Sequence, residues 1–239
     1  MPSALDRAKD AARACRREFR SLVGREVHVP RQHPSRGIHL GTDYGGWWVL
    51  PEGLGPTSVV YGVGVGQDIS WDLAMIDRFG CPVHAFDPTP RCLKWIATQT
   101  LPSRFVFHPW GLAEHDGVAT FVMRSDDPRW SSYNPSDDTS NAHEVVRADV
   151  RRLTTIMREL GHDHIDVLKM DIEGGEFAVL KDLLAGSVRP RQLLVEYHYW
   201  GQQRGNVPAL RESVAALRDA GYRLFARSPN GPELCFARA

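Results

Sequence analysis

The chain of 239 residues carries 29 Lys and Arg against 29 Asp and Glu, which gives a formal net charge of zero and a pI near 7.2. This balance lacks the basic footprint of a general nucleic-acid binder, so no nucleic-acid partner is expected. The length fits one large α/β domain or two small ones, and the 42% hydrophobic content is ordinary for a globular protein.

The sequence gives no sign of membrane association. No apolar run is long enough to cross a bilayer, and residues 1–19 carry charges throughout. The four cysteines are scattered, with neither a C-x-x-C pair nor the spacing of metal ligands. A cytoplasmic location with reduced thiols is therefore expected.

The N-terminal segment is predicted to form a helix over residues 3–23, because apolar side chains recur there at spacings of three and four. A lead-in rich in Gly and Pro follows and runs to about residue 56. We therefore divide the chain into an N-terminal helix and lead-in arm over residues 1–56 and a domain over residues 57–239. The apolar stripe of the helix could pack on a second copy, so a homodimer through it is one expected assembly.

From residue 57 onward, short apolar runs alternate with amphipathic stretches, which is typical of a parallel sheet built from β-α-β units. The last two apolar runs flank the turn sequence PNGP and predict an antiparallel hairpin. The expected fold is α/β, with a mostly parallel seven-stranded sheet that ends in this C-terminal hairpin. The predicted strands are 58–63, 82–87, 104–109, 118–124, 144–149, 165–173, 192–198, 222–228 and 233–239. The predicted helices are 69–80, 91–99, 151–161, 177–186 and 207–221.

Three alternating glycines follow the first of these strands, in the sequence SVVYGVGVGQD over residues 58–68. Gly62, Gly64 and Gly66 lie between a strand and a helix, where glycine permits a tight turn and the close approach of a ligand. Asp87 closes the next strand, where a carboxylate can bind both ribose hydroxyls of a nucleotide-containing cofactor. The alternative role for Asp87 is capping of the following helix, since prolines suited to a first helical turn come directly after it.

The spacing of the glycines favours S-adenosyl-L-methionine over a nicotinamide cofactor, because the third glycine of a dinucleotide site is missing at its longer spacing. KMDIEGGE at 169–176 resembles the strand-four motif of FkbM-type methyltransferases. TDYGGWWV at 42–49, YGVGVGQDISWD at 61–72 and GCPVHAFDPTP at 80–90 resemble the methyltransferase-like proteins related to that group. The resemblance covers roughly residues 40–200. It implies a Rossmann-like class I methyltransferase domain over 57–239 that uses S-adenosyl-L-methionine.

One departure from that family concerns the end of the first strand. Many FkbM-type proteins carry an acidic residue just before the first glycine, whereas Val60 and Tyr61 stand here. Asp68, which also appears in the matching motif of the methyltransferase-like group, is our candidate to bind the amino group of the cofactor. The alternative for Asp68 is capping of the helix that starts near Ile69.

Residues that carry chemistry are expected after the fourth and fifth strands of the parallel sheet, because ligands of such sheets bind beyond the carboxyl ends of their strands. Asp171 is expected to contact the cofactor and to take part in catalysis with Glu196 and His198. His198 is the candidate general base toward an acceptor hydroxyl, since histidine titrates near neutral pH. Capping of a helix is the expected role of Glu176.

A metal ion is not favoured by the sequence, although one arrangement would suit it. Asp171 and Glu173 share one face of an extended chain, and Glu196 and His198 repeat the same spacing. Together these four side chains offer oxygen and nitrogen ligands for a divalent ion.

Other candidates lie outside these motifs. Gly111, after the third strand, is expected near the adenine of the cofactor. The aromatic residues of the lead-in, Tyr44, Trp47 and Trp48, form either a lid over the cleft or part of the packed core. Candidates for lining an acceptor pocket are Trp130, Tyr133, Tyr197, Tyr199 and Trp200.

The function that these features predict is S-adenosylmethionine-dependent methyl transfer, with O-methylation of a hydroxyl on a small molecule such as a natural product or sugar. The resemblance implies this class of acceptor. One alternative is a nicotinamide-dependent oxidoreductase, although the Y-x-x-x-K pair of the short-chain dehydrogenases is missing. Another is a non-catalytic cofactor-binding module of the same fold, which the missing strand-one acid supports.

Overall fold

The structure is a computed structural model and describes residues 12, 15, 16, 19, 21, 26–125, 133–199, 207–229 and 231–238. Most of the predicted N-terminal helix lies outside these residues, as do Trp130 and Trp200. The arm, and any dimer that it forms, therefore stay predictions. In the described part of the chain, every helix is too short or too polar to cross a membrane.

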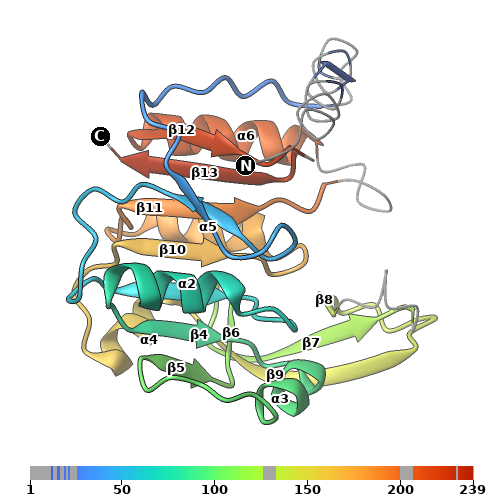
Figure 1. The fold of residues 1–239 in the computed structure, drawn as a ribbon. Coiled ribbons are helices and arrows are strands. Elements are labelled where there is room, and N and C mark those ends of the chain that lie inside the picture. The colour runs from blue at the N-terminus through green and yellow to red at the C-terminus, as the bar shows by residue number, and fades with distance from the viewer. Residues whose placement is uncertain are drawn as a thin grey trace.

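A seven-stranded sheet forms the centre of the molecule, in the order β12-β13-β11-β10-β3-β4-β5 (Figure 1). Five neighbouring strands run parallel, and β13 pairs antiparallel with both β11 and β12. The mostly parallel sheet and its C-terminal antiparallel hairpin are thus confirmed. The strands are β3 (Val60–Val63), β4 (Val83–Phe86), β5 (Phe105–His108), β10 (Val167–Met170), β11 (Gln192–Glu196), β12 (Tyr222–Arg227) and β13 (Glu233–Arg238).

Helices cover both faces of this sheet, because strands that are apolar on both sides must be buried on both sides. Side chains of α4, α5 and α6 share a hydrophobic cluster with one face. Those of α2 and α3 pack in two clusters on the other side. The helices are α2 (Ser70–Phe79), α3 (Pro90–Ile96), α4 (Leu153–Leu160), α5 (Glu176–Ala185) and α6 (Val207–Asp219).

The lead-in contains a pair of strands that the sequence did not predict. β1 (Ile38–Leu40) and β2 (Trp47–Val49) pair antiparallel, and Trp47 and Val49 are buried in the same cluster as Trp71 of α2. Each strand has three residues, too short for a visible alternation of side chains. The boundary drawn at residue 56 stays a prediction, although this part of the arm shares the core of the sheet.

A second sheet of four strands lies beside the first, in the order β6-β9-β7-β8. The predicted strands 118–124 and 144–149 form its long antiparallel pair, while the two-residue strands were not predicted. In Figure 1 it lies on the side to which the arrowheads of β4, β10 and β11 point. Its strands are β6 (Gly111–Leu112), β7 (Gly117–Met123), β8 (Asn134–Pro135) and β9 (Glu144–Arg151).

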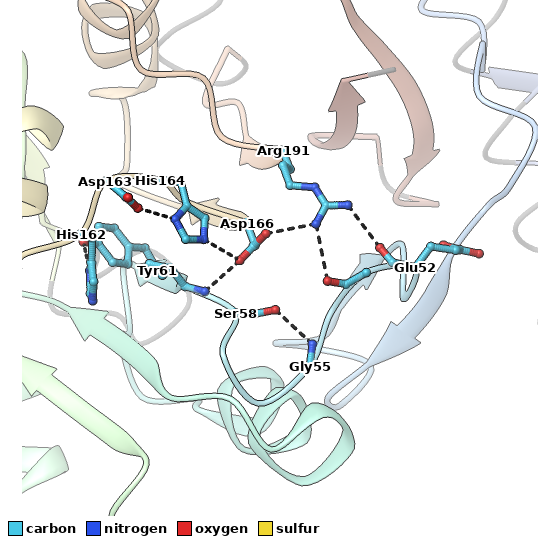
Figure 2. Close-up of polar contacts among 11 residues, drawn as sticks. Glu52, Gly55, Ser58, Tyr61, His162, Asp163, His164, Asp166 and Arg191 are labelled. Carbon is cyan, nitrogen blue, oxygen red and sulfur yellow. Dashed lines mark hydrogen bonds and ion pairs between the residues drawn. The ribbon is translucent and has the colours of Figure 1, made fainter.

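The opposite, amino-terminal end of the central sheet is fastened by the buried carboxylate of Asp166 (Figure 2). Val59 N donates to Asp166 Oδ2 at 3.0 Å, and Arg191 Nη1 donates to Oδ1 at 3.1 Å. His164 Nε2 lies 3.5 Å from Oδ2. One side chain therefore links the starts of β3, β10 and β11.

Asp166→Ala is expected to lower the free energy of unfolding by about 2–3 kcal/mol, because it leaves the buried Val59 amide without a partner and Arg191 without its carboxylate. Urea unfolding measures this change. Asp163→Ala is the matched control. The side chain of Asp163 is 95% exposed, and among the described residues its one ion pair is with His164. That variant should unfold at the same urea concentration as wild type, because a fully exposed ion pair contributes little. Equal losses in the two variants would contradict this role of Asp166.

Three histidines gather near the strand-one tyrosine. Tyr61 Oη lies 2.7 Å from His162 Nδ1, and His84 Nδ1 lies 3.1 Å from His108 Nε2. The rings of His84 and His108 are stacked, with centroids 5.4 Å apart. Burial, together with the charges of His162 and His108, lowers the pKa of His84 to about 4. His84 is therefore neutral in the folded protein at neutral pH.

The pKa of His84 is about 4 in the folded protein, against about 6.5 in the unfolded chain. Below pH 6.5 the unfolded chain therefore binds the proton more readily, and the free energy of unfolding falls as the pH drops toward 4. His84→Phe is expected to reduce the loss of stability between pH 7 and 4.5 by about 1–2 kcal/mol, a figure discounted for the part of the ring that solvent reaches. Urea unfolding at both pH values tests this. His115→Phe, at a histidine whose side chain is 50% exposed, should leave the acid-side loss unchanged. An unchanged slope in His84→Phe would refute the account.

Candidate active site

A cleft of about 2000 Å³ opens at the carboxyl ends of β3, β4, β10 and β11. The glycine loop after β3 forms one wall, and side chains of β7, β8 and β9 line the side toward the second sheet. Of the residues predicted for the site, the following line this cleft: Gly64, Gly66, Asp68, Asp87, Gly111, Asp171, Glu173, Glu196 and His198. Gly62, another glycine predicted to bind the cofactor, does not line the cleft, because it lies inside β3, where an added Cβ would meet Asp72 Oδ1 at 2.5 Å.

Two of the glycines are required for different reasons. Gly64 has φ +81°, and a Cβ there would lie 1.7 Å from the carbonyl oxygen of Asp171. This glycine therefore lets the ends of β3 and β10 approach each other closely. Gly66 has φ +55°, and its Cβ position faces open space. It leaves room beside the loop in the cleft.

Asp87 holds the glycine loop in place. Val65 N and Gly66 N donate to its Oδ2 at 3.1 and 2.9 Å, while Thr89 N and Thr89 Oγ1 donate to its Oδ1 at 2.9 and 2.6 Å. These four donors match the lone-pair positions of a carboxylate. Asp87 thus holds Thr89, the N-cap residue of α3, although no side chain caps the first turn of that helix. A ribose contact stays a prediction and needs the rotatable Thr89 hydroxyl to turn away.

Asp68 ties the lead-in to the glycine loop. Ser70 N donates to its Oδ1 at 2.7 Å, and Thr42 Oγ1 donates to its Oδ2 at 3.0 Å. Burial alone would raise the pKa of Asp68, but these hydrogen bonds outweigh burial and lower it. The carboxylate therefore stays charged at the edge of the cleft, and it also accepts a hydrogen bond from Ser70, the first residue of α2. Binding of a ligand amino group stays a prediction.

Asp171 and Glu196 form a pair of neighbouring carboxyl groups. Burial, and then the charge of Asp171, raises the pKa of Glu196 to about 9. Burial also raises the pKa of Asp171, against the opposing charges of His198 and Lys169. Both shifts have the direction expected for two neighbouring carboxyl groups that do not readily ionise together.

His198 is held between carboxylates, with 15% of its side chain exposed. Its Nδ1 donates to Glu176 Oε1 at 2.8 Å, and its Nε2 lies 3.2 Å from Glu173 Oε2. Burial opposes protonation, but the hydrogen bond and charge of Glu176 lead the effects that raise the pKa of His198 to about 10. His198 is therefore protonated at neutral pH in this state. Its role as general base stays a prediction, and requires bound ligands to change that balance.

Three residues of the site were not predicted as functional. Lys169, only 6% exposed, donates from Nζ to Gly64 O at 3.0 Å and places a cation under the glycine loop. Glu176 caps its own loop through Gly174 N and also orients His198. Asp72 is buried behind Gly62, and burial raises its pKa to about 6. The sequence carried a signal for Lys169, because it is a charged residue within an otherwise apolar strand.

The predicted aromatic lining is corrected in part. Tyr133 lines the cleft, but Tyr197 and Tyr199 are buried in the core. The physical reason is the alternation of β-strand side chains, since Glu196 and His198 already face the cleft. Trp47 also belongs to the core, whereas Tyr44 is 90% exposed and lines the cleft. Although the residue as a whole is largely exposed, desolvation of its hydroxyl and the charge of Asp171 raise the pKa of Tyr44.

The comparisons with known proteins agree with this geometry. The family model of the methyltransferase FkbM domain matches residues 60–224, which include the glycine loop and the ends of β10 and β11. The chain belongs to this family. The family resemblance expected from the sequence motifs is confirmed.

Two curated relatives of this FkbM-domain chain are similar over 175 residues. Both are named probable methyltransferase-like protein 24. The rat protein is 29% identical over 70% of this chain and 42% of its own length, and the human protein is 28% identical over 70% and 41%. The chain thus spans about two fifths of the length of these relatives. No solved structure matches it significantly.

Proposed function

We propose that this FkbM domain is an S-adenosylmethionine-dependent methyltransferase that acts on a hydroxyl oxygen of a small molecule. Its family membership and its methyltransferase-like relatives support methyl transfer as the reaction. The mostly parallel sheet with its antiparallel C-terminal hairpin suits the Rossmann-like class I methyltransferase fold. The observation that carries the choice of cofactor is the charge of the cleft around the glycine loop.

That part of the cleft suits a cation better than a pyrophosphate. Dinucleotide sites bind pyrophosphate through free backbone amides after the first strand. Here the amides of Val65 and Gly66 already donate to Asp87. The facing wall carries the carboxyl groups of Asp171 and Glu196. The ammonium and sulfonium groups of S-adenosylmethionine are cationic, so this donor set fits that cofactor and disfavours a nicotinamide dinucleotide.

Four residues of the cleft are assigned roles in binding the cofactor. Gly66 leaves space for the cofactor beside the loop, and Asp87 accepts hydrogen bonds from the ribose. Asp68 accepts the amino group, in place of the acidic residue missing from strand one. Gly111, packed against Pro88, borders the space for the adenine. Bound there, S-adenosylmethionine supplies an activated methyl group, and the protein has to orient the acceptor and accept its proton.

An acceptor hydroxyl is the chemistry that the facing side chains suit best. Asp171, Glu196 and His198 lie together on the wall of the cleft, and this is where we expect an acceptor hydroxyl to enter. Once bound ligands change the charges of these three side chains, one of them can accept the proton that the acceptor hydroxyl releases. A non-catalytic module of the same fold is the second candidate, because Val60 and Tyr61 replace the usual strand-one acid.

Labelled methyl transfer tests the proposal. The protein is incubated with S-adenosylmethionine carrying a labelled methyl group, and with a cell extract separated into small molecules and macromolecules. Label is expected in the small-molecule fraction as an O-methyl group, and Asp171→Asn should reduce its incorporation by at least about tenfold. Label confined to protein, nucleic acid or amines would contradict the proposed acceptor. Incorporation that Asp171→Asn leaves unchanged would contradict the assigned site.

A further inference from the structure

Three side chains of different chemistry converge at the carboxyl ends of β10 and β11. A carboxylate oxygen of Asp171, one of Glu196 and a ring nitrogen of His198 all lie within 4.8 Å of one another. Ligand atoms bound to one cation at about 2.0–2.2 Å lie no more than about 4.4 Å apart. Small rotations of these side chains therefore bring all three atoms onto one ion.

His198 is already oriented as a metal-binding histidine would be. Its Nδ1 donates to Glu176 Oε1 at 2.8 Å, and Glu176 has no exposed surface. This contact fixes the ring, and Nε2 then faces Glu173 Oε2 at 3.2 Å and Asp171 Oδ1 at 3.9 Å. In metal sites, a ligating histidine commonly donates its other ring nitrogen to a carboxylate in this way. Nothing in the assigned methyl-donor site requires such an arrangement.

Two buried carboxylate oxygens at this place have no hydrogen-bond partner among the described residues. Asp171 Oδ1 is buried and accepts no hydrogen bond from the described residues, and the same holds for Glu176 Oε2. The other nearby cation, Lys169, donates to the backbone at Gly64 O. Asp171 and Glu196 offer neighbouring carboxylate oxygens, and a divalent cation between them would meet the buried Asp171 oxygen.

We propose that Asp171, Glu196 and His198 bind a divalent cation of the Mn²⁺ and Mg²⁺ class. Two carboxylates and one imidazole form an oxygen-rich set that suits these ions. Three protein ligands leave further coordination positions open toward the cleft, where an oxygen of the acceptor can bind. This role for the ion rests on the proposed function, whereas binding of the ion itself does not.

Binding of Mn²⁺ to the full chain tests the site, because free Mn²⁺ is measured directly by electron paramagnetic resonance. Wild type is expected to bind one Mn²⁺, and Mg²⁺ should displace it. Asp171→Asn and His198→Ala should each weaken binding at least tenfold. Glu176→Gln, which keeps the shape but loses the charge that orients His198, should weaken it about 10-fold. Glu114→Gln, at an exposed carboxylate that lines the same cleft, should leave the affinity unchanged.

Thermal unfolding of each variant shows whether it is folded. The proposal would be overturned if wild type bound no Mn²⁺ at about 1 mM, a concentration on the order of the Kd of a weak site. So would equal affinities in wild type and Asp171→Asn. If S-adenosylhomocysteine stabilises the protein while Mn²⁺ does not bind, the metal site fails and the methyltransferase proposal survives. If Mn²⁺ binds and S-adenosylhomocysteine does not, the metal site survives and the methyltransferase proposal fails.

Discussion

Gly64→Ala is expected to lower the free energy of unfolding by more than about 4 kcal/mol, which few single substitutions do. An alanine Cβ would lie 1.7 Å from Asp171 O and 2.7 Å from Asp171 C, so the backbone itself has to move. That movement would disturb two hydrogen bonds between strands, from Asp171 N to Val63 O and from Gly64 N to Phe86 O. Both the central sheet and the floor of the cleft depend on them.

Urea unfolding compares this variant with Gly66→Ala. Gly66 also has a positive φ, but its Cβ position meets no atom within 4 Å. Its replacement should therefore cost only the conformational strain of about 1–2 kcal/mol. Gly66→Ala should stay folded and bind S-adenosylhomocysteine more weakly, because the new methyl group enters space that the proposal gives to the cofactor. Similar losses of stability in the two variants would show that the close approach at Gly64 is not what the loop requires.

Asp87→Asn is expected to weaken S-adenosylhomocysteine binding by roughly 10- to 100-fold. A hydrogen bond from a ribose hydroxyl to a charged group contributes about 1.5–3 kcal/mol, and each 1.4 kcal/mol is tenfold in affinity. Loss of affinity alone does not identify the ribose contact, since Asp87 also holds the amides of Val65 and Gly66. A second ligand separates the two roles.

The second ligand is the 2′-deoxy analogue of S-adenosylhomocysteine, titrated calorimetrically against both proteins. Wild type should bind the analogue at least tenfold more weakly than the parent compound, and Asp87→Asn should bind the two about equally. Thr89→Val is the control, because it removes one donor to Asp87 but keeps the carboxylate. If the penalty for the missing hydroxyl is the same in wild type and Asp87→Asn, then Asp87 only supports the loop.

The central sheet could be predicted because local sequence signals agree with its tertiary packing. Gly80 and Gly161 end helices in the left-handed conformation, and Pro90 begins one. The runs of apolar residues in β3, β10 and β11 are buried on both faces. The β1–β2 pair could not be predicted, because its strands are held by contacts with α2 and the core instead of by a pattern of their own.

The site could be predicted as a set of residues but not as an electrostatic arrangement. Glu196 and His198 were placed on one face by their spacing, and the structure brings them together with Asp171. That Glu176 orients His198 depends on a contact between α5 and the segment after β11. The shift in the pKa of His198 follows from that contact, so sequence spacing alone suggested a neutral base.

Thermal unfolding with S-adenosylhomocysteine, and with NADH in parallel, tests the central claim most directly. A ligand present at 100 times its Kd adds about 2.7 kcal/mol to the stability of the folded state. For a chain of this size, that corresponds to a rise in Tm of roughly 5–10 °C. The account predicts this rise with S-adenosylhomocysteine and no rise with NADH. A rise with NADH alone, or with neither ligand, would contradict the assignment of the cleft as a methyl-donor site.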